Sequence, residues 1–202
     1  MSVVKEGLFL IIIPLVLGFF FLFIIKELGI ILIILALFFA YFFRDPAREI
    51  VKSRDEILSP CDGTVMEVTE DDNFKIVRVF LSVFSVHLQR SPVEGSVADV
   101  QYNPGKFLPA MDPKAHELNE NNIITIDSPK GRFKVKQIAG ILARRVVSWV
   151  KPKDNLAQGQ KIGFIKFGSQ VDLFTPKNVN LNVKVGDKVF GGKTVFGKFK
   201  ND

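Results

Sequence analysis

Cysteine and histidine are scarce in this chain of 202 residues, which contains one cysteine and two histidines. Cys61 has no second thiol with which to form an internal disulfide or a CxxC metal site. His87 and His116 are too few to complete a structural zinc site with one cysteine. The sequence therefore excludes disulfide-stapled scaffolds and zinc modules, and we expect no metal cofactor.

The chain also lacks a stripe of basic residues interleaved with aromatic residues, which is typical of nucleic-acid-binding proteins. The formal net charge is +6, but the lysines and arginines are dispersed among acidic residues. We interpret this basic balance as attraction to an anionic membrane surface or to a phosphate head group. Nucleic acid is therefore not an expected partner.

Residues 1–43 form an apolar block in which, from Leu8 onward, only Lys26 and Glu27 are charged. As one helix, residues 8–43 would be about 54 Å long, whereas a hydrocarbon core is about 30 Å thick. We therefore predict a break at Lys26–Gly29 and a helical hairpin that is transmembrane or embedded in the membrane. Basic residues flank the hairpin on both sides, which predicts a cell-membrane protein with its following domain on the cytoplasmic side. These flanking residues are Lys5, Arg44, Arg48, Lys52 and Arg54.

The pattern of residues 44–202 predicts one mainly β domain, a sandwich or a barrel. Short runs rich in aromatic and β-branched residues alternate with turn residues, as in half-buried strands. Residues 102–122 contain three prolines and few apolar repeats, and we expect a long loop there, with or without a short helix. Residues 141–150 fit a helix or a strand equally well. The predicted strands lie within residues 57–68, 75–84, 93–97, 123–127, 132–138, 161–174, 181–190 and 194–199.

The pair Gly168-Ser169 interrupts the strand pattern of residues 161–174. An isolated glycine in a strand usually marks a β-bulge or a tight bend, and that interpretation explains the pair when it is considered alone. The alternative is that the peptide bond itself reacts, because glycine leaves its carbonyl open to the following hydroxyl and tolerates strained geometry. The rest of the chain must decide between the two.

Asp62, His87 and Ser169 each have an ordinary structural explanation. Asp62 precedes a glycine in a turn, where an aspartate commonly satisfies backbone groups. His87 follows an apolar strand, and Ser169 fits a strand serine. Together, however, they provide an acid, an imidazole and a hydroxyl, which are the components of an activated nucleophile.

Five segments of the chain can be compared with known motifs: Phe43–Pro46, Ser59–Gly63, Ser82–Pro92, Gln137–Arg145 and Phe164–Leu173. In this order they closely resemble the motifs of the phosphatidylserine decarboxylase family. The short chain with an N-terminal hairpin is most similar to the compact archaeal and bacterial branch, which includes archaetidylserine decarboxylases. The resemblance covers the chain from about Arg44 to Leu173 and extends weakly to the end.

The resemblance implies a proenzyme that cleaves itself between Gly168 and Ser169, with residue 169 becoming a covalent pyruvoyl cofactor. It implies that Asp62 and His87 complete the triad that activates Ser169. The implied reaction is decarboxylation of a serine phospholipid, phosphatidylserine or archaetidylserine, to the ethanolamine phospholipid. The large and small chains would then form a heterodimer, with a higher oligomer also open. A ketone that accepts electrons suits this reaction, and the imidazole, which titrates near neutral pH, is a candidate proton donor.

Three arginines, Arg90, Arg144 and Arg145, are candidate ligands of the substrate phosphate, because a guanidinium offers a bidentate fork. Solvated or membrane-contacting positions explain them equally well. Two positions depart from the family pattern. Gln170 stands where a threonine is common after the Gly-Ser pair, and Ser85 stands where an acid is common. The second departure removes any carboxylate assistance from beside the histidine.

A second function class remains open on other residues. The segments 183–192 and 62–65 resemble half-motifs of biotinyl and lipoyl hybrid-barrel domains, which would suit a non-catalytic, membrane-anchored adaptor. The chain has no convincing lysine turn for such a modification, so we interpret the likeness as shared sheet architecture. Self-cleavage at Ser169 distinguishes the two classes, because an adaptor has no use for it.

Overall fold

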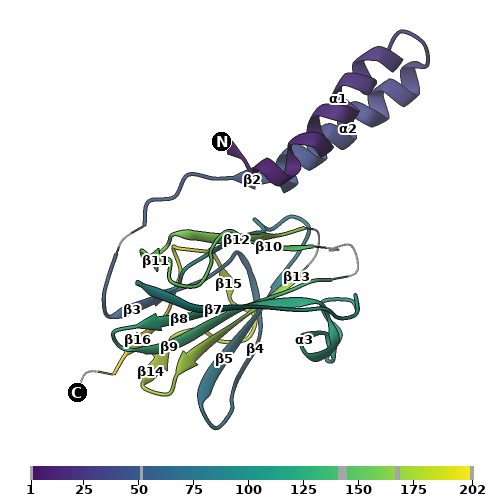
Figure 1. The fold of residues 1–202 in the computed structure, drawn as a ribbon. Coiled ribbons are helices and arrows are strands. Elements are labelled where there is room, and N and C mark those ends of the chain that lie inside the picture. The colour runs from purple at the N-terminus through teal and green to yellow at the C-terminus, as the bar shows by residue number, and fades with distance from the viewer. Residues whose placement is uncertain (1, 51, 141–144, 167–168, 201–202) are drawn as a thin grey trace. The chain divides into compact units, whose positions relative to one another are not determined.

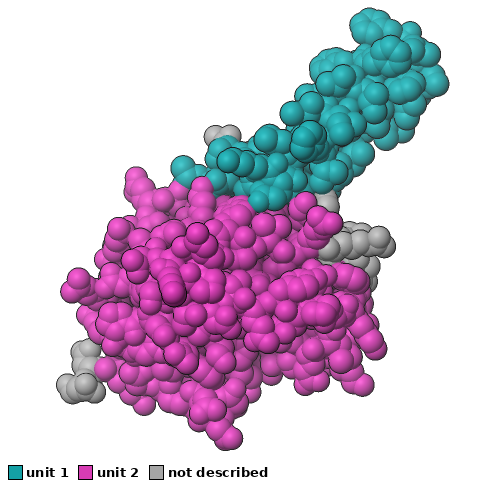
Figure 2. Space-filling view, viewed as in Figure 1, with its two compact units in different colours: residues 1–47 teal, residues 48–202 magenta. Residues whose placement is uncertain are grey.

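The structure is a computed structural model that describes residues 2–50, 52–140, 145–166 and 169–200. The chain divides into two compact units, residues 1–47 and residues 48–202, which are coloured separately in Figure 2. Each unit has its own secondary structure, shown in Figure 1, and the second unit carries all of the candidate catalytic residues.

The first unit is a helical hairpin. A short strand and a turn of 3-10 helix, β1 (Ser2–Val3) and η1 (Lys5–Gly7), precede α1 (Leu8–Phe21) and α2 (Lys26–Phe42). The strand β2 (Arg44–Asp45) then pairs with β1 in antiparallel fashion. In the part of the chain that the structure describes, no helix has both the length and the apolar character needed to cross a membrane.

The predicted position of the break was wrong, although the two arms were correct. The chain reverses at residues 22–25, and Lys26 already begins α2. Gly29 serves a different purpose from the one expected, since a Cβ added to it would lie 2.5 Å from Leu22 N and 2.8 Å from Gly18 O. Glycine is therefore needed for the close approach of the two helices and does not end either of them.

The second unit is mainly β, as predicted, and its largest element is a curled sheet of eight antiparallel strands. The strand order is β11-β7-β8-β9-β13-β5-β4-β15. β13 therefore lies in the interior of the sheet, with β9 on one side and β5 on the other. In chain order the strands are β4 (Gly63–Glu70), β5 (Phe74–Leu81), β7 (Gly95–Asn103), β8 (Asn121–Ser128), β9 (Gly131–Ile138), β11 (Asn155–Leu156), β13 (Ser169–Pro176) and β15 (Lys188–Val189).

Two three-stranded sheets complete this unit (Figure 1). One has the order β10-β12-β6 and consists of β10 (Val146–Ser148), β12 (Lys161–Ile165) and β6 (Leu88–Arg90). The other has the order β14-β16-β3 and consists of β14 (Val179–Leu181), β16 (Val195–Phe199) and β3 (Glu56–Leu58). All three sheets contribute to one hydrophobic core, through residues such as Val135, Ile165 and Phe196.

The predicted interruption of residues 161–174 is a change of sheet. β12 ends at Ile165 in a three-stranded sheet, and β13 begins at Ser169 in the eight-stranded sheet. The long loop was also predicted correctly, since residues 104–120 contain only the short helix α3 (Ala115–Leu118) among regular elements. The predicted strand over residues 181–190 was too long, because a turn replaces its middle. In that turn Asp187 Oδ2 accepts the Lys184 N–H at 2.9 Å and Gly186 has a φ of 94°.

Candidate active site

Ser169 is the first residue of β13 and is fully buried. Its backbone lies opposite Leu81 of β5. The Oγ atom has no hydrogen-bond partner among the residues that the structure describes. A buried polar atom without a partner is uncommon, because its desolvation is not compensated. The Ser169 hydroxyl therefore makes no hydrogen bond that stabilises the described part of the fold. Gly168, the other half of the predicted cleavage site, lies outside the described residues.

His87 is also fully buried, and one contact of its ring indicates which nitrogen carries the proton in the neutral form. Its Nδ1 lies 3.0 Å from the backbone carbonyl oxygen of Ser85. A carbonyl oxygen can only accept, so Nδ1 donates, and in the neutral imidazole the lone pair is on Nε2. The side chain at position 85 is not required for this contact, so the departure from the family pattern at Ser85 leaves the imidazole oriented. Nε2 is the atom of His87 that can act as a base.

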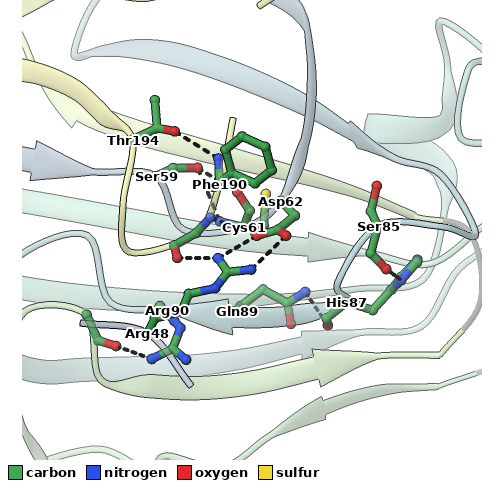
Figure 3. A network of polar contacts seen from close by, with 12 residues as sticks. Arg48, Ser59, Cys61, Asp62, Ser85, His87, Gln89, Arg90, Phe190 and Thr194 are labelled. Atoms are coloured by element: carbon green, nitrogen blue, oxygen red, sulfur yellow. Dashed lines mark hydrogen bonds and ion pairs between the residues drawn. The ribbon is translucent and has the colours of Figure 1, made fainter. Parts of the chain in front are cut away.

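Asp62 lies in the turn between β3 and β4, and its carboxylate is bound by an arginine. Arg48 Nη1 donates to Oδ1 at 2.6 Å and Arg48 Nη2 donates to Oδ2 at 2.7 Å, while the Gly191 N–H donates to Oδ1 at 2.8 Å. Figure 3 shows this bidentate pair and, separately, the contact of His87 with Ser85. Asp62 was expected to orient His87, but the backbone carbonyl of Ser85 makes that contact, at Nδ1 of His87. The role of Asp62 in catalysis therefore stays a prediction, and its structural partner is Arg48.

Arg48 was not predicted to be part of the site. Its position in a basic stretch after the apolar block suggested contact with the membrane surface. Its side chain is only 8% exposed, and besides Asp62 it also donates to the carbonyl of Gly191. A buried carboxylate needs a cationic or multiply donating partner, but the burial of Asp62 is visible only in the structure, so no sequence signal indicated this pair.

The three candidate phosphate ligands have different surroundings. Arg90 is 6% exposed, and its Nη1 donates to the carbonyl of Gly159 at 2.9 Å. Arg145 is exposed. Arg144 lies outside the described residues. Arg90 is thus buried, and its guanidinium binds a backbone carbonyl. Of the two described arginines, Arg145 is the more accessible to solvent.

Gln170, which departs from the family pattern, has a specific partner two residues further along β13. Its Nε2 donates to Asp172 Oδ1 at 2.5 Å, and both residues are buried. Burial raises the pKa of Asp172 above its ordinary value of 3.8, an effect opposed by the Gln170 hydrogen bond and by the charge of Arg78. Arg78 Nε lies 3.4 Å from Asp172 Oδ2 on the neighbouring strand β5. Gln170, which directly follows Ser169, is therefore held in place by its hydrogen bond to Asp172.

The order and spacing of these residues agree with a known family. A family model described as phosphatidylserine decarboxylase matches residues 35–197. The chain belongs to the phosphatidylserine decarboxylase family. A phosphatidylserine decarboxylase proenzyme from Carboxydothermus hydrogenoformans is 45% identical, over 86% of this chain and 85% of that protein. Proteins of the same name from Symbiobacterium thermophilum and Geotalea uraniireducens are 43% and 40% identical, over 88% and 85% of this chain and 86% and 84% of their own lengths.

Membership of the phosphatidylserine decarboxylase family makes the chain an enzyme, a carboxy-lyase. The adaptor alternative is thereby set aside. The relatives are named as proenzymes. Among the described residues, no three His, Cys, Asp or Glu side chains are grouped so that they could hold a metal ion.

Proposed function

We propose that this chain decarboxylates a serine phospholipid, phosphatidylserine or archaetidylserine, with a pyruvoyl group made from Ser169. The observation that carries the proposal is the buried Ser169 hydroxyl, which has no partner among the described residues at the point where the chain changes sheets. A partnerless hydroxyl is free to attack the preceding carbonyl. The proenzyme names of the relatives support the same reaction.

The first stage is an exchange of an amide for an ester. Ser169 Oγ attacks the carbonyl carbon of Gly168, His87 Nε2 takes the hydroxyl proton, and the same proton passes to the departing amide nitrogen of Ser169. Removal of the α-proton of residue 169 then expels the Gly168 carboxylate by β-elimination. The enamine left at residue 169 tautomerises to an imine, water hydrolyses the imine, and ammonia leaves. The products are a chain ending at Gly168 and a chain beginning with a pyruvoyl group at residue 169.

The second stage is decarboxylation of the lipid. A pyruvoyl ketone at residue 169 supplies an electron sink for the electrons left behind when carbon dioxide departs. We assign the return of a proton to His87, whose Nδ1 hydrogen bond to Ser85 holds the ring in one orientation. Asp62 supports the site through its pair with Arg48, and Arg90, Arg144 and Arg145 remain candidates for the substrate phosphate.

The proposed location is the cell membrane, with the second unit on the cytoplasmic side. Large apolar side chains cover the hairpin, and Phe9 and Phe23 are 79% and 91% exposed. Burial of such side chains in lipid is favourable, which supports attachment of the first unit to the membrane that holds the substrate. The two chains produced by cleavage are proposed to stay together as a heterodimer, because β13 is paired on both sides by strands of the larger chain.

Expression of the full chain tests the proposal directly. The wild-type protein is expected to give two bands, residues 1–168 and residues 169–202, and the smaller one should resist N-terminal sequencing. Ser169→Ala is expected to give one intact band of 22.7 kDa. Ser96→Ala, at a half-buried strand serine, is the matched control and should cleave like the wild type. One intact band from the wild type would refute self-cleavage.

The substrate class is tested separately on the cleaved protein. Detergent-dispersed phosphatidylserine and archaetidylserine are each incubated with it, and carbon dioxide release is measured. Release from either lipid supports the reaction, and the ratio of the two rates identifies the preferred backbone. A cleaved protein that releases carbon dioxide from neither lipid would refute the proposed substrate class while leaving self-cleavage intact.

A further inference from the structure

Three buried carboxamides form a continuous hydrogen-bonded chain that ends on the backbone of His87. Asn122 Nδ2 donates to Gln137 Oε1 at 2.9 Å, Gln137 Nε2 donates to Gln89 Oε1 at 2.8 Å, and Gln89 Nε2 donates to the His87 carbonyl at 2.8 Å. We call these three residues the amide relay. Their exposed fractions are 4% for Asn122 and 0% for both glutamines. The last bond appears beside His87 in Figure 3.

The direction of the relay follows from its end. The carbonyl oxygen of His87 can only accept, so the amide nitrogen of Gln89 must face it, and its oxygen must face Gln137. The same reasoning then places the nitrogen of Gln137 towards Gln89 and its oxygen towards Asn122. Every amide in the relay therefore has one orientation: reversal of either glutamine would break two relay bonds, and reversal of Asn122 would break one.

The relay connects the eight-stranded sheet, which contains Ser169, with the three-stranded sheet whose strand β6 begins directly after His87. Asn122 and Gln137 lie opposite each other on β8 and β9, and Gln137 also lies opposite Val171 of β13. Gln89 belongs to β6 in a three-stranded sheet. Side chains alternate along a strand, so Ser169 shares the core-facing side of β13 with Val171. The Gln137–Gln89 bond thus connects the nucleophile's sheet to the histidine's segment.

The carbonyl at the end of the relay is also tied to the strand that leads to the cleavage site. The His87 oxygen accepts the Ile165 N–H at 3.1 Å, and Ile165 is the last residue of β12. Gly163 of the same strand makes room for the relay, because a Cβ there would lie 2.6 Å from Gln137 Nε2. A single carbonyl therefore joins the histidine, the relay and the strand before the reactive bond.

We infer that the amide relay sets the position of His87 relative to Ser169 for self-cleavage, with Gln89 and Gln137 as positioning residues. The inference rests on the proposed function, since it assumes that His87 is the base. A base must lie within hydrogen-bond reach of the proton it takes, and small displacements of such groups are costly to rate. The relay acts on that position because its Gln137–Gln89 bond links the two sheets, a link that the longer 3.4 Å contact of Gln137 Nε2 with the Val147 carbonyl reinforces.

The first test compares self-cleavage rates after pulse-labelled cell-free synthesis of the full chain. Gln137→Met and Gln89→Met keep the side-chain length and remove the relay bonds, and each should slow cleavage about ten- to a hundred-fold. The double variant should be no slower than the slower single variant, because one relay is broken in all three. Multiplication of the two effects in the double variant would overturn the inference.

Gln158→Met is the matched control. Gln158 is 5% exposed and makes three hydrogen bonds, with Ser53 N, Glu56 O and Pro92 O, none of which involves the relay. Thermal unfolding of each variant, measured in the Ser169→Ala background, shows how much stability is lost. The inference requires that Gln158→Met cleave like the wild type at a comparable loss of stability. Equal slowing in the control would make the relay merely structural.

The second test uses Gln137→Glu, whose hydrogen-bonding ability depends on pH. A protonated glutamic acid can donate to Gln89 and accept from Asn122, whereas a carboxylate can only accept. The ratio of the variant's cleavage rate to the wild-type rate should therefore fall as pH rises, and using the ratio removes the pH effects that the two proteins share. A ratio that does not change with pH would overturn the inference. Absence of cleavage in the wild type would instead refute the proposed function.

Discussion

Replacement of Arg48 by methionine tests the pairing that the structure gives to Asp62. The Arg48 and Asp62 side chains are 8% and 11% exposed and are joined by two hydrogen bonds of 2.6 and 2.7 Å. Methionine keeps the apolar stem and leaves the carboxylate with the Gly191 N–H as its remaining donor among the described residues. Breaking a buried ion pair on one side costs about 3–5 kcal/mol, because the remaining charge stays buried. For a domain of this size that loss lowers the unfolding midpoint by about 6–20 °C.

The assay is thermal unfolding in the Ser169→Ala background, so that one intact chain unfolds. Arg54→Met is the matched control, because Arg54 pairs with Glu94 at the surface and their side chains are 86% and 50% exposed. Such a pair contributes less than about 1 kcal/mol, so the control should hardly shift the midpoint. Asp62→Asn introduced into the Arg48→Met chain should recover part of the loss, since a neutral amide replaces the unpaired charge. Equal midpoints for Arg48→Met and Arg54→Met would refute the reasoning.

Three further expectations follow from the described contacts. Ser169→Ala should be as stable as, or more stable than, an uncleaved wild-type chain, because it removes a buried hydroxyl that has no partner among the described residues; a clear loss in chemical denaturation would contradict this. Burial raises the pKa of Asp172, so its favourable contribution is fully present below its unfolded pKa and is lost as pH rises through the folded one. The midpoint of thermal unfolding should therefore fall less steeply with rising pH in Asp172→Asn than in the chain that keeps Asp172. An equal slope in the two proteins would contradict this role of Asp172. Gly163→Ala should cost about 1–3 kcal/mol, measured by denaturant titration, because its Cβ would lie 2.4 Å from the carbonyl oxygen of Val147. A neutral effect at Gly163 would contradict the close approach.

Local patterns in the sequence predicted the mainly β unit, the two helical arms and the long loop, because periodicity and turn residues act over a few positions. The position of the helix break was predicted wrongly for a physical reason. Gly29 and the charges beside it resemble a helix end, but the glycine is required by a helix that packs against it from elsewhere in the chain. Contacts of that kind are not visible in a local pattern.

The candidate site shows the same limit. Ser169, His87 and Asp62 were chosen for their chemistry and for the motifs around them, and the structure shows that all three are buried. The sequence pattern did not indicate Arg48 as the partner of Asp62, since the two residues meet across a turn and a linker. Gln89 and Gln137 were also missed, because a glutamine has no chemical signature until its neighbours on other strands are known.

The interior position of β13 has a consequence for the lifetime of the enzyme. Before the proposed cleavage, an unfolded chain can refold by itself, since every strand belongs to one molecule. Afterwards β13, β14, β15 and β16 belong to a separate short chain, and recovery of the sheet requires two molecules to meet. Refolding then depends on concentration, whereas unfolding does not. After the proposed cleavage, the lifetime of the enzyme would therefore depend on its unfolding rate and no longer on a reversible folding equilibrium. A molecule that unfolds after cleavage would rarely regain its active fold.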